Sequence, residues 1–239
     1  MPLFVKPDRK ISVQDVKNAM RDHYEGTPLD ISKDFGAGPY HTPYRLSPLS
    51  FKVGDKEYFN ERPISTQQSG FVFVAQMRST LPDAIGGVLW FGTDDANMTV
   101  FTPVYCCTDK VPVCYSRVDG ADYITFSWNS SFWIFNWVSN MVYPRYDLMI
   151  GDVRATQNEL ETTFNEAQEG IESAAAKLLE KDPAKAKAFL TNYTNMTAQS
   201  AFDTWKRLGE FIIVKYNDGV VRKMKDGKFE RNAIGQPAG

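Results

Sequence analysis

The residues that could carry catalysis are few and widely spaced. There are two histidines, His23 and His41, and three cysteines, Cys106, Cys107 and Cys114. A cysteine nucleophile needs a base or a positive environment that lowers the pKa of its thiol. Cys106 and Cys107 stand at the end of an expected strand with no histidine in the local sequence. We therefore interpret the cysteines as buried structural thiols. Adjacent cysteines form only a strained disulfide, so we expect no disulfide framework.

Two further groups of polar residues suggest chemistry. Asp22 and His23 resemble an acid–base couple, but neighbours on a helix project about 100° apart and do not readily hydrogen-bond to each other. We interpret His23 as a helix-end histidine on a solvated face. Asp94, Asp95 and Asn97 lie between two expected strands, where turn formation is sufficient to explain them.

The remaining patterns exclude several classes of protein. No HExxH, paired CxxC, Walker loop or GxGxxG occurs, so we expect no metal and no cofactor. The net charge of −2 provides no basic field for nucleic acid. The most apolar segment, residues 126–141, is interrupted by three asparagines, and no segment reaches the roughly 18 apolar residues of a membrane span. We therefore expect no nucleic-acid and no membrane partner.

The expected elements begin with a helix. Ser12 is a suitable N-cap, and Asp15 stands three residues later in the capping-box position. Val13, Val16 and Met20 then recur at helical spacing. Residues 30–60, rich in Gly, Pro, Ser and Tyr, are expected to form a long loop of the kind that carries function or wraps a surface.

Four short strands are predicted next, in an antiparallel meander with both faces of its sheet covered. Their ranges are residues 70–77, 85–91, 98–105 and 111–117. The pattern then changes to helix. The helices are expected at residues 130–143, interrupted by Pro144, at 145–181, and from Asp182 to Leu208-Gly209. A final hairpin is expected over residues 211–224 around the Asn217-Asp218-Gly219 turn. No repeat or linker divides the chain, so we expect one α+β domain over residues 1–239.

Three blocks of sequence together resemble bacterial cysteine dipeptidases. These enzymes belong to the N-terminal-nucleophile hydrolases and are related to penicillin V acylase and bile-salt hydrolase. The first block is the run Met20-Arg21-Asp22-His23-Tyr24-Glu25-Gly26-Thr27-Pro28, with Asp15-Val16 before it and Asp30 after it. The second comprises Arg62 to Thr66, Phe71-Val72, Gln76 to Arg78, Leu81-Pro82 and Ile85-Gly86. The third comprises Trp90-Phe91-Gly92 and Phe101 to Tyr105. The blocks stand in the family's order.

The resemblance implies part of a four-layer αββα sandwich and a particular mechanism. In this family an N-terminal cysteine attacks the peptide carbonyl, and its own α-amino group acts as the base. This chain has Met1 and Pro2 instead and resembles the C-terminal portion of the family, so we expect the nucleophile upstream of Met1. Arg62 is the one residue carried over as catalytic, because in the related acylases an arginine at the start of the comparable block contributes to the active site. The alternative for Arg62 is a surface or loop-capping arginine.

Two functions from different classes follow. The first is part of a dipeptidase, with a dipeptide as substrate once an N-terminal segment completes the enzyme. The alternative is a non-catalytic binding or interaction module derived from the same fold, which would use residues 30–60 and the aromatic helix around Trp128, Trp133 and Trp137. A half-sandwich exposes sheet edges and apolar faces, so we expect self-association or pairing with the missing half.

Overall fold

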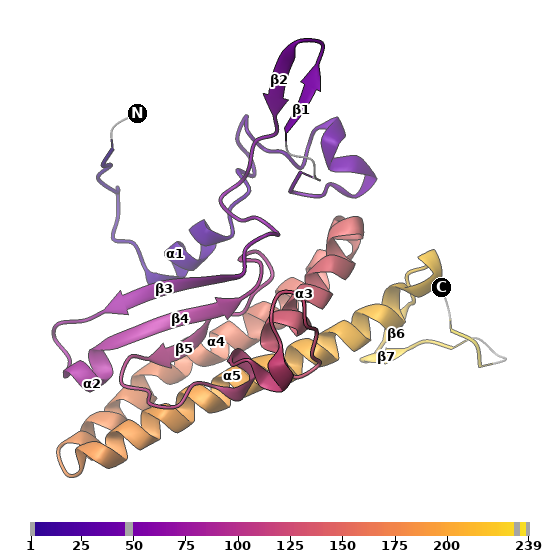
Figure 1. Cartoon of the computed structure of the whole chain (residues 1–239). Helices are drawn as coiled ribbons and strands as arrows, with labels where there is room; N and C mark the ends of the chain where they lie inside the picture. Colours follow the sequence, from indigo (N-terminus) through magenta and orange to yellow (C-terminus); the bar gives the residue numbers. More distant parts are fainter. Residues whose placement is uncertain (1–2, 46–49, 232–234, 238–239) are drawn as a thin grey trace.

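A computed structural model describes residues 3–45, 50–231 and 235–237. A three-stranded antiparallel sheet lies against two long helices, and a small hairpin projects from the upper part of the molecule (Figure 1). The predicted α+β class, with the sheet preceding the long helices, is confirmed. The principal elements are α1 (Val13–Met20), β1 (Ser50–Val53), β2 (Lys56–Phe59), β3 (Phe71–Met77), α2 (Asp83–Gly86), β4 (Gly87–Thr93), β5 (Thr102–Tyr105), α3 (Ser131–Val142), α4 (Tyr146–Leu179), α5 (Pro183–Tyr216), β6 (Met224–Lys225) and β7 (Lys228–Phe229).

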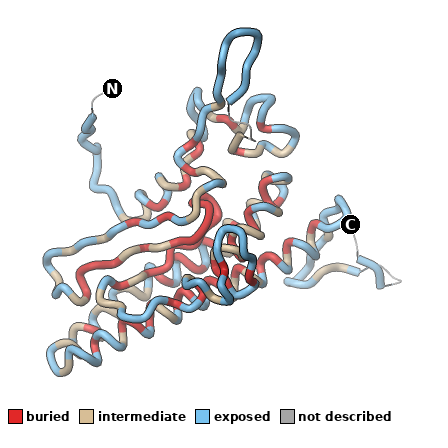
Figure 2. The backbone as a smooth tube through the Cα atoms, in the orientation of Figure 1, coloured by how far each residue is buried: buried red, intermediate tan, exposed pale blue. Residues whose placement is uncertain are grey.

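The sheet has the order β3-β4-β5 and buries one of its two faces. In its register Val74 pairs with Trp90, and Phe73 pairs with Phe91. Side chains alternate across a strand, so Val74 and Trp90 enter the core against the helices while Phe73 remains exposed on the opposite face. Figure 2 shows β4 largely buried and β3 mostly exposed, with isolated buried residues. The prediction that both faces are covered is wrong for the described residues.

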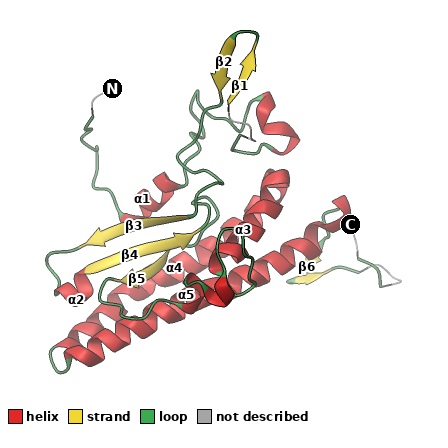
Figure 3. Ribbon diagram, viewed as in Figure 1, coloured by secondary structure: helices red, strands yellow, loops and turns green. Residues whose placement is uncertain are grey.

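The predicted strand at residues 111–117 is also wrong. This segment forms 3₁₀ turns at Val113–Tyr115 and Val118–Gly120, which continue into the loop before α3 (Figure 3). Residues 30–60, predicted as loop, contain a 3₁₀ helix, Phe35–Tyr40, and the β1–β2 hairpin. Every residue of β1 and β2 is exposed, so this hairpin has no buried face to give an alternating hydrophobic pattern.

The helices follow the predicted N-terminal signals closely. Ser12 and Asp15 form the expected capping box of α1, and the Asp182 carboxylate accepts the backbone N–H groups of Ala184 and Lys185 at the start of α5. Pro144 lies in a 3₁₀ turn that separates α3 from α4, as predicted. Within the described ranges, no helix is both long and apolar enough to cross a membrane.

The predicted end of the last helix at Gly209 is wrong, because α5 continues to Tyr216. A Cβ at Gly209 would lie 2.3 Å from the ring of Trp137, so glycine at this position lets α3 and α5 approach closely. Ile212, assigned to a strand from the sequence, is buried in the core as part of α5. The hairpin forms later, between β6 and β7.

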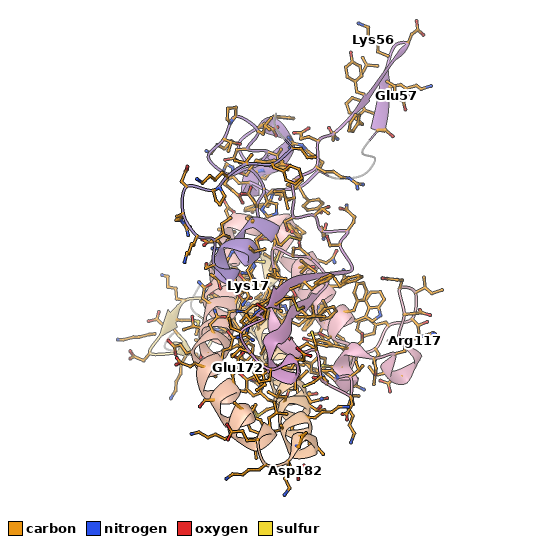
Figure 4. All side chains as sticks on the ribbon, turned by 90° about the vertical axis from the view of Figure 1, so that its left-hand side faces the viewer. Lys17, Lys56, Glu57, Arg117, Glu172 and Asp182 are labelled. Atoms are coloured by element: carbon orange, nitrogen blue, oxygen red, sulfur yellow. The ribbon has the colours of Figure 1, made fainter. Side chains whose placement is uncertain are left out.

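Polar contacts attach α1 and the sheet to α4. Arg21, just after α1, pairs with Glu161 at 2.5 Å, and Glu161 also accepts the backbone N–H of Phe101 at 2.8 Å. Lys17 is fully buried with its Nζ 3.5 Å from the centre of the Trp90 ring, and burial lowers the pKa of Lys17 to about 8. Figure 4 shows Lys17 within the body of the molecule. These contacts fix the segment that follows α1.

Candidate functional site

Asp94 lies at the end of β4 in the left-handed backbone region, with φ of 66°. Its backbone N–H donates to the carbonyl of Gly70 at 2.9 Å, which holds it at the edge of the sheet. Its carboxylate accepts the side-chain amide of Asn136 at 2.8 Å and the hydroxyl of Ser139 at 3.0 Å, both from α3. Burial, reinforced by the neighbouring charge of Asp95, raises the pKa of Asp94 to about 7.

Asp95 extends the same cluster into the core. The hydroxyls of Tyr143 and Ser65 donate to its carboxylate at 2.6 and 3.2 Å, and the backbone N–H of Asn97 donates at 3.0 Å. Burial raises the pKa of Asp95 above its usual range, against these hydrogen bonds. Burial and the facing carboxylate raise the pKa of Tyr143 well above its usual value.

His23 is completely buried, so its interpretation as a solvated helix-end residue is wrong. The chain leaves α1 at Arg21, and Tyr24 takes a positive φ of 64°, so His23 belongs to an inward turn. Its Nδ1 lies 2.9 Å from the carboxylate of Glu25 and does not contact Asp22. Its Nε2 has no hydrogen-bond partner among the described residues. A buried ring nitrogen without a partner is uncommon and marks this place as a candidate site.

Asn97 joins the cluster to α4. Its side-chain amide donates to the hydroxyl of Tyr146 at 3.1 Å, and its oxygen accepts a hydrogen bond from Arg154. Gln157 donates to its backbone carbonyl at 3.1 Å. The predicted turn is present, since the Asp95 carboxylate accepts the backbone N–H of Asn97, but residues 94–97 also belong to a buried polar network that turn formation alone does not require. The signal in the sequence was two carboxylates and a carboxamide within four residues, directly after an apolar strand.

Two neighbouring cavities lie beside this network. The polar cavity, of about 440 Å³, is lined by Asp94 and Asn136, and the apolar cavity, of about 320 Å³, is lined by aromatic side chains. Gly70, Tyr123 and Phe132 line both. A carboxyl group with a pKa near 7 exchanges a proton efficiently at neutral pH. The arrangement therefore combines a group suited to proton transfer with space for a small organic ligand.

Arg62, the residue carried over as catalytic, is exposed in the segment that leads from β2 to the cluster. Ser65, three residues later, contacts Asp95. In the part of the chain that the structure describes, no hydrogen bond or ion pair joins the Arg62 side chain to another residue. The structure therefore brings Ser65 and His23 to the cluster region but leaves Arg62 at its periphery.

The cysteines are free thiols in three different environments. Cys114 is buried, and burial raises its pKa to about 12. Cys107 is half-buried, which also raises its pKa. Cys106 is exposed, so its interpretation as a buried structural thiol is wrong. Among the described residues, no group of three or more His, Cys, Asp or Glu side chains is arranged to hold a metal ion.

Comparison with known proteins matches the chain to a peptidase family. The profile of peptidase family C69 matches residues 1–159. The chain is 27% identical over 223 residues to a probable dipeptidase B of Lactococcus lactis. The aligned residues cover 90% of this chain and 40% of that protein. It is 34% identical over 104 residues to a probable dipeptidase of Salmonella dublin, covering 44% and 19% respectively.

A third relative has a similar name. Dipeptidase A of Lactobacillus helveticus is 26% identical over 133 residues, covering 56% of this chain and 23% of that protein. The chain therefore spans less than half the length of each of these curated relatives.

Proposed function

The chain belongs to peptidase family C69, and we propose that it is part of an enzyme that hydrolyses dipeptides. The family match over residues 1–159 carries this proposal, and the names of the relatives support it. The Asp94 region is compatible with the proposal, because it provides a proton-exchanging group beside two cavities.

The proposed nucleophile is an N-terminal cysteine carried by residues outside this sequence. The thiolate is the attacking species, so a raised pKa disfavours Cys107 and Cys114 in that role. Cys106 is exposed, but its thiol makes no hydrogen bond with another residue of the described chain. A thiol without a neighbouring base is a weak candidate for an activated nucleophile.

A dipeptide-hydrolysis assay tests the proposal directly. We expect the chain in isolation to hydrolyse no dipeptide, and the enzyme completed by an N-terminal segment of the related dipeptidases to be active. In the completed enzyme, joint replacement of Cys106, Cys107 and Cys114 by serine should preserve the activity. Activity of the isolated chain would overturn the proposed nucleophile. Inactivity of a correctly folded completed enzyme would favour the non-catalytic binding module.

Arg62 is proposed to act in the completed active site, where its positive charge would face the reacting peptide. We expect Arg62→Ala to lower kcat/KM by roughly 10²-fold, the order found on removing one charge-stabilising donor. Because Arg62 is exposed and has no partner among the described residues, the free energy of unfolding should change by less than about 0.5 kcal/mol.

Lys56→Ala, which removes an exposed positive charge from β2, is the matched control and should leave kcat/KM unchanged. Equal kcat/KM values for Arg62→Ala and the unsubstituted enzyme would assign Arg62 to the surface instead.

A further inference from the structure

The apolar cavity is an aromatic enclosure beside the start of β3 and the end of β4. Phe71 of β3 stacks on Phe91 of β4 with ring centres 6.0 Å apart, and Tyr115 meets Phe91 edge-on at 5.2 Å. Tyr123 and Phe132 line another side, with their rings nearly perpendicular and 5.5 Å apart, and the cavity is open to solvent where Tyr123 is exposed. The cavity volume of about 320 Å³ lies at the lower end of the roughly 300–1,000 Å³ of small-molecule sites. It therefore suits one large apolar side chain.

The loop that carries the mouth of this cavity is held in place. The indole N–H of Trp133 donates to the carbonyls of both Asp122 and Thr125, at 3.0 and 2.8 Å. Gly70 lies beside the Tyr123 side chain, since a Cβ at Gly70 would lie 3.1 Å from the Tyr123 hydroxyl. The Trp133 hydrogen bonds order the loop beside the cavity, which reduces the entropy cost of binding.

Two opposite charges lie at the mouth. Arg117 and Asp122 both line the cavity and pair at 3.3 Å, with side chains 76% and 38% exposed. Figure 4 shows Arg117 on a loop at the side of the body. Hydrogen bonds from the backbone N–H of Ile124 and from Thr125 lower the pKa of Asp122, so it remains a carboxylate at neutral pH. An exposed single-contact pair of this kind is weak and opens readily to other partners.

A ligand that matches this site carries one large apolar side chain and two opposite charges close together. The backbone of a dipeptide spans about 7 Å at most, at 3.3–3.6 Å per residue, so its α-ammonium and α-carboxylate lie within reach of neighbouring side chains. A guanidinium binds a carboxylate through paired hydrogen bonds. The adjoining polar cavity shares Gly70, Tyr123 and Phe132 and contains the Asp94 carboxyl group.

We propose that this cavity binds dipeptides with an aromatic or large aliphatic side chain, with Arg117 holding the α-carboxylate and Asp122 the α-ammonium. The proposal rests on the proposed dipeptidase function and specifies its preferred substrates. Ring contacts and burial of apolar area favour the side chain in the enclosure. The two charges select free, unblocked dipeptides.

Isothermal titration of the whole chain tests the site, with chromatography to confirm that each peptide stays intact. The probes are Phe-Ala, Ala-Ala, N-acetyl-Phe-Ala and Phe-Ala amide. We expect Phe-Ala to bind, and each of the other three to bind about 10- to 100-fold more weakly, because each loses apolar burial or one charge-assisted contact. Equal affinities for Phe-Ala and Ala-Ala, or no binding of Phe-Ala at millimolar concentration, would overturn the proposal.

Charge variants test which side chain binds each terminus of the dipeptide. Asp122→Asn should abolish the preference for Phe-Ala over its N-acetyl form, and Arg117→Gln should abolish the preference over the amide. Both side chains are exposed, so the far-UV circular dichroism should be unchanged. Lys185→Gln, which removes an exposed charge at the distant α4–α5 tip, is the control and should bind like the unsubstituted chain. Preferences that survive both charge variants would overturn the assigned roles.

The binding and hydrolysis experiments distinguish failure of this site from failure of the proposed function. Selective binding without hydrolysis by the completed enzyme would support the site and contradict the dipeptidase. Hydrolysis by the completed enzyme without selective binding here would support the dipeptidase and overturn the site.

Discussion

At the residue scale, protonation of the buried Asp94 carboxyl group makes the stability of the folded chain depend on pH. Its pKa of about 7 lies above the roughly 3.9 of an unfolded aspartate. The folded state therefore retains a proton that the unfolded state releases. The stability this proton contributes is complete below about pH 4 and is lost as the pH rises to about 7.

We expect Asp94→Asn to remove this pH dependence. Between pH 5 and pH 8 the free energy of unfolding of the unsubstituted chain should fall by roughly 2 kcal/mol relative to that of the variant. Urea unfolding at pH 5, 6, 7 and 8 measures the difference. Asp55→Asn, which removes an exposed carboxylate in the β1–β2 turn, should leave the pH dependence unchanged. Parallel curves for Asp94→Asn and the unsubstituted chain would contradict the raised pKa.

At the element scale, the packing of α3 against α5 depends on the missing side chain at Gly209. Phe135 of α3 also stacks on Trp205 of α5, with ring centres 4.7 Å apart, so the two helices share an aromatic interface. We expect Gly209→Ala to lower the free energy of unfolding by roughly 1–3 kcal/mol, because its methyl group would overlap the Trp137 ring.

Gly170→Ala is the matched control on α4. An added Cβ there meets no atom within 4 Å, so alanine should stabilise the chain by about 0.5–1 kcal/mol through its higher helix propensity. Urea unfolding of both variants compares the two effects. A stabilising Gly209→Ala would show that α3 and α5 do not approach as closely as described.

At the scale of the whole molecule, the outer face of the β3-β4-β5 sheet exposes large apolar side chains. Phe73 and Met77 of β3 are 50% and 62% exposed and point to this face, beyond the apolar cavity that Phe71 lines. An exposed apolar patch of this kind marks an interaction surface. In the four-layer sandwich implied by the family resemblance, we propose that a second sheet covers the part of this face around Phe73 and Met77 and leaves the apolar cavity open.

In the isolated chain we expect this face to drive self-association. Size-exclusion chromatography with light scattering should show oligomers whose population grows with concentration, and Phe73→Thr should reduce it while preserving a strand-forming residue. Val111→Thr, which changes an exposed apolar residue outside the sheet, is the control. A clean monomer at high concentration would exclude self-association through this face.

The sequence by itself determined the elements whose signals are local. The Ser12–Asp15 capping box, the Asp182-Pro183 helix start and the break at Pro144 depend on hydrogen bonds and backbone geometry within a few residues, and all three are confirmed. The three sheet strands were predicted in approximate position for the same reason. The family was also recognisable, because the run from Met20 to Pro28 is long and has no generic structural cause.

Only the tertiary structure decided which residues meet at the candidate site. Asp94, His23 and Tyr143 are separated by many residues in the chain, and their burial depends on the packing of α3 and α4 over the end of the sheet. Gly209 resembled a helix end because local sequence does not reveal an incoming Trp137 ring. Burial depends on contacts between distant segments, so the local sequence indicated the turn at residues 94–97 but not the buried polar network around it, and it placed His23 in solvent.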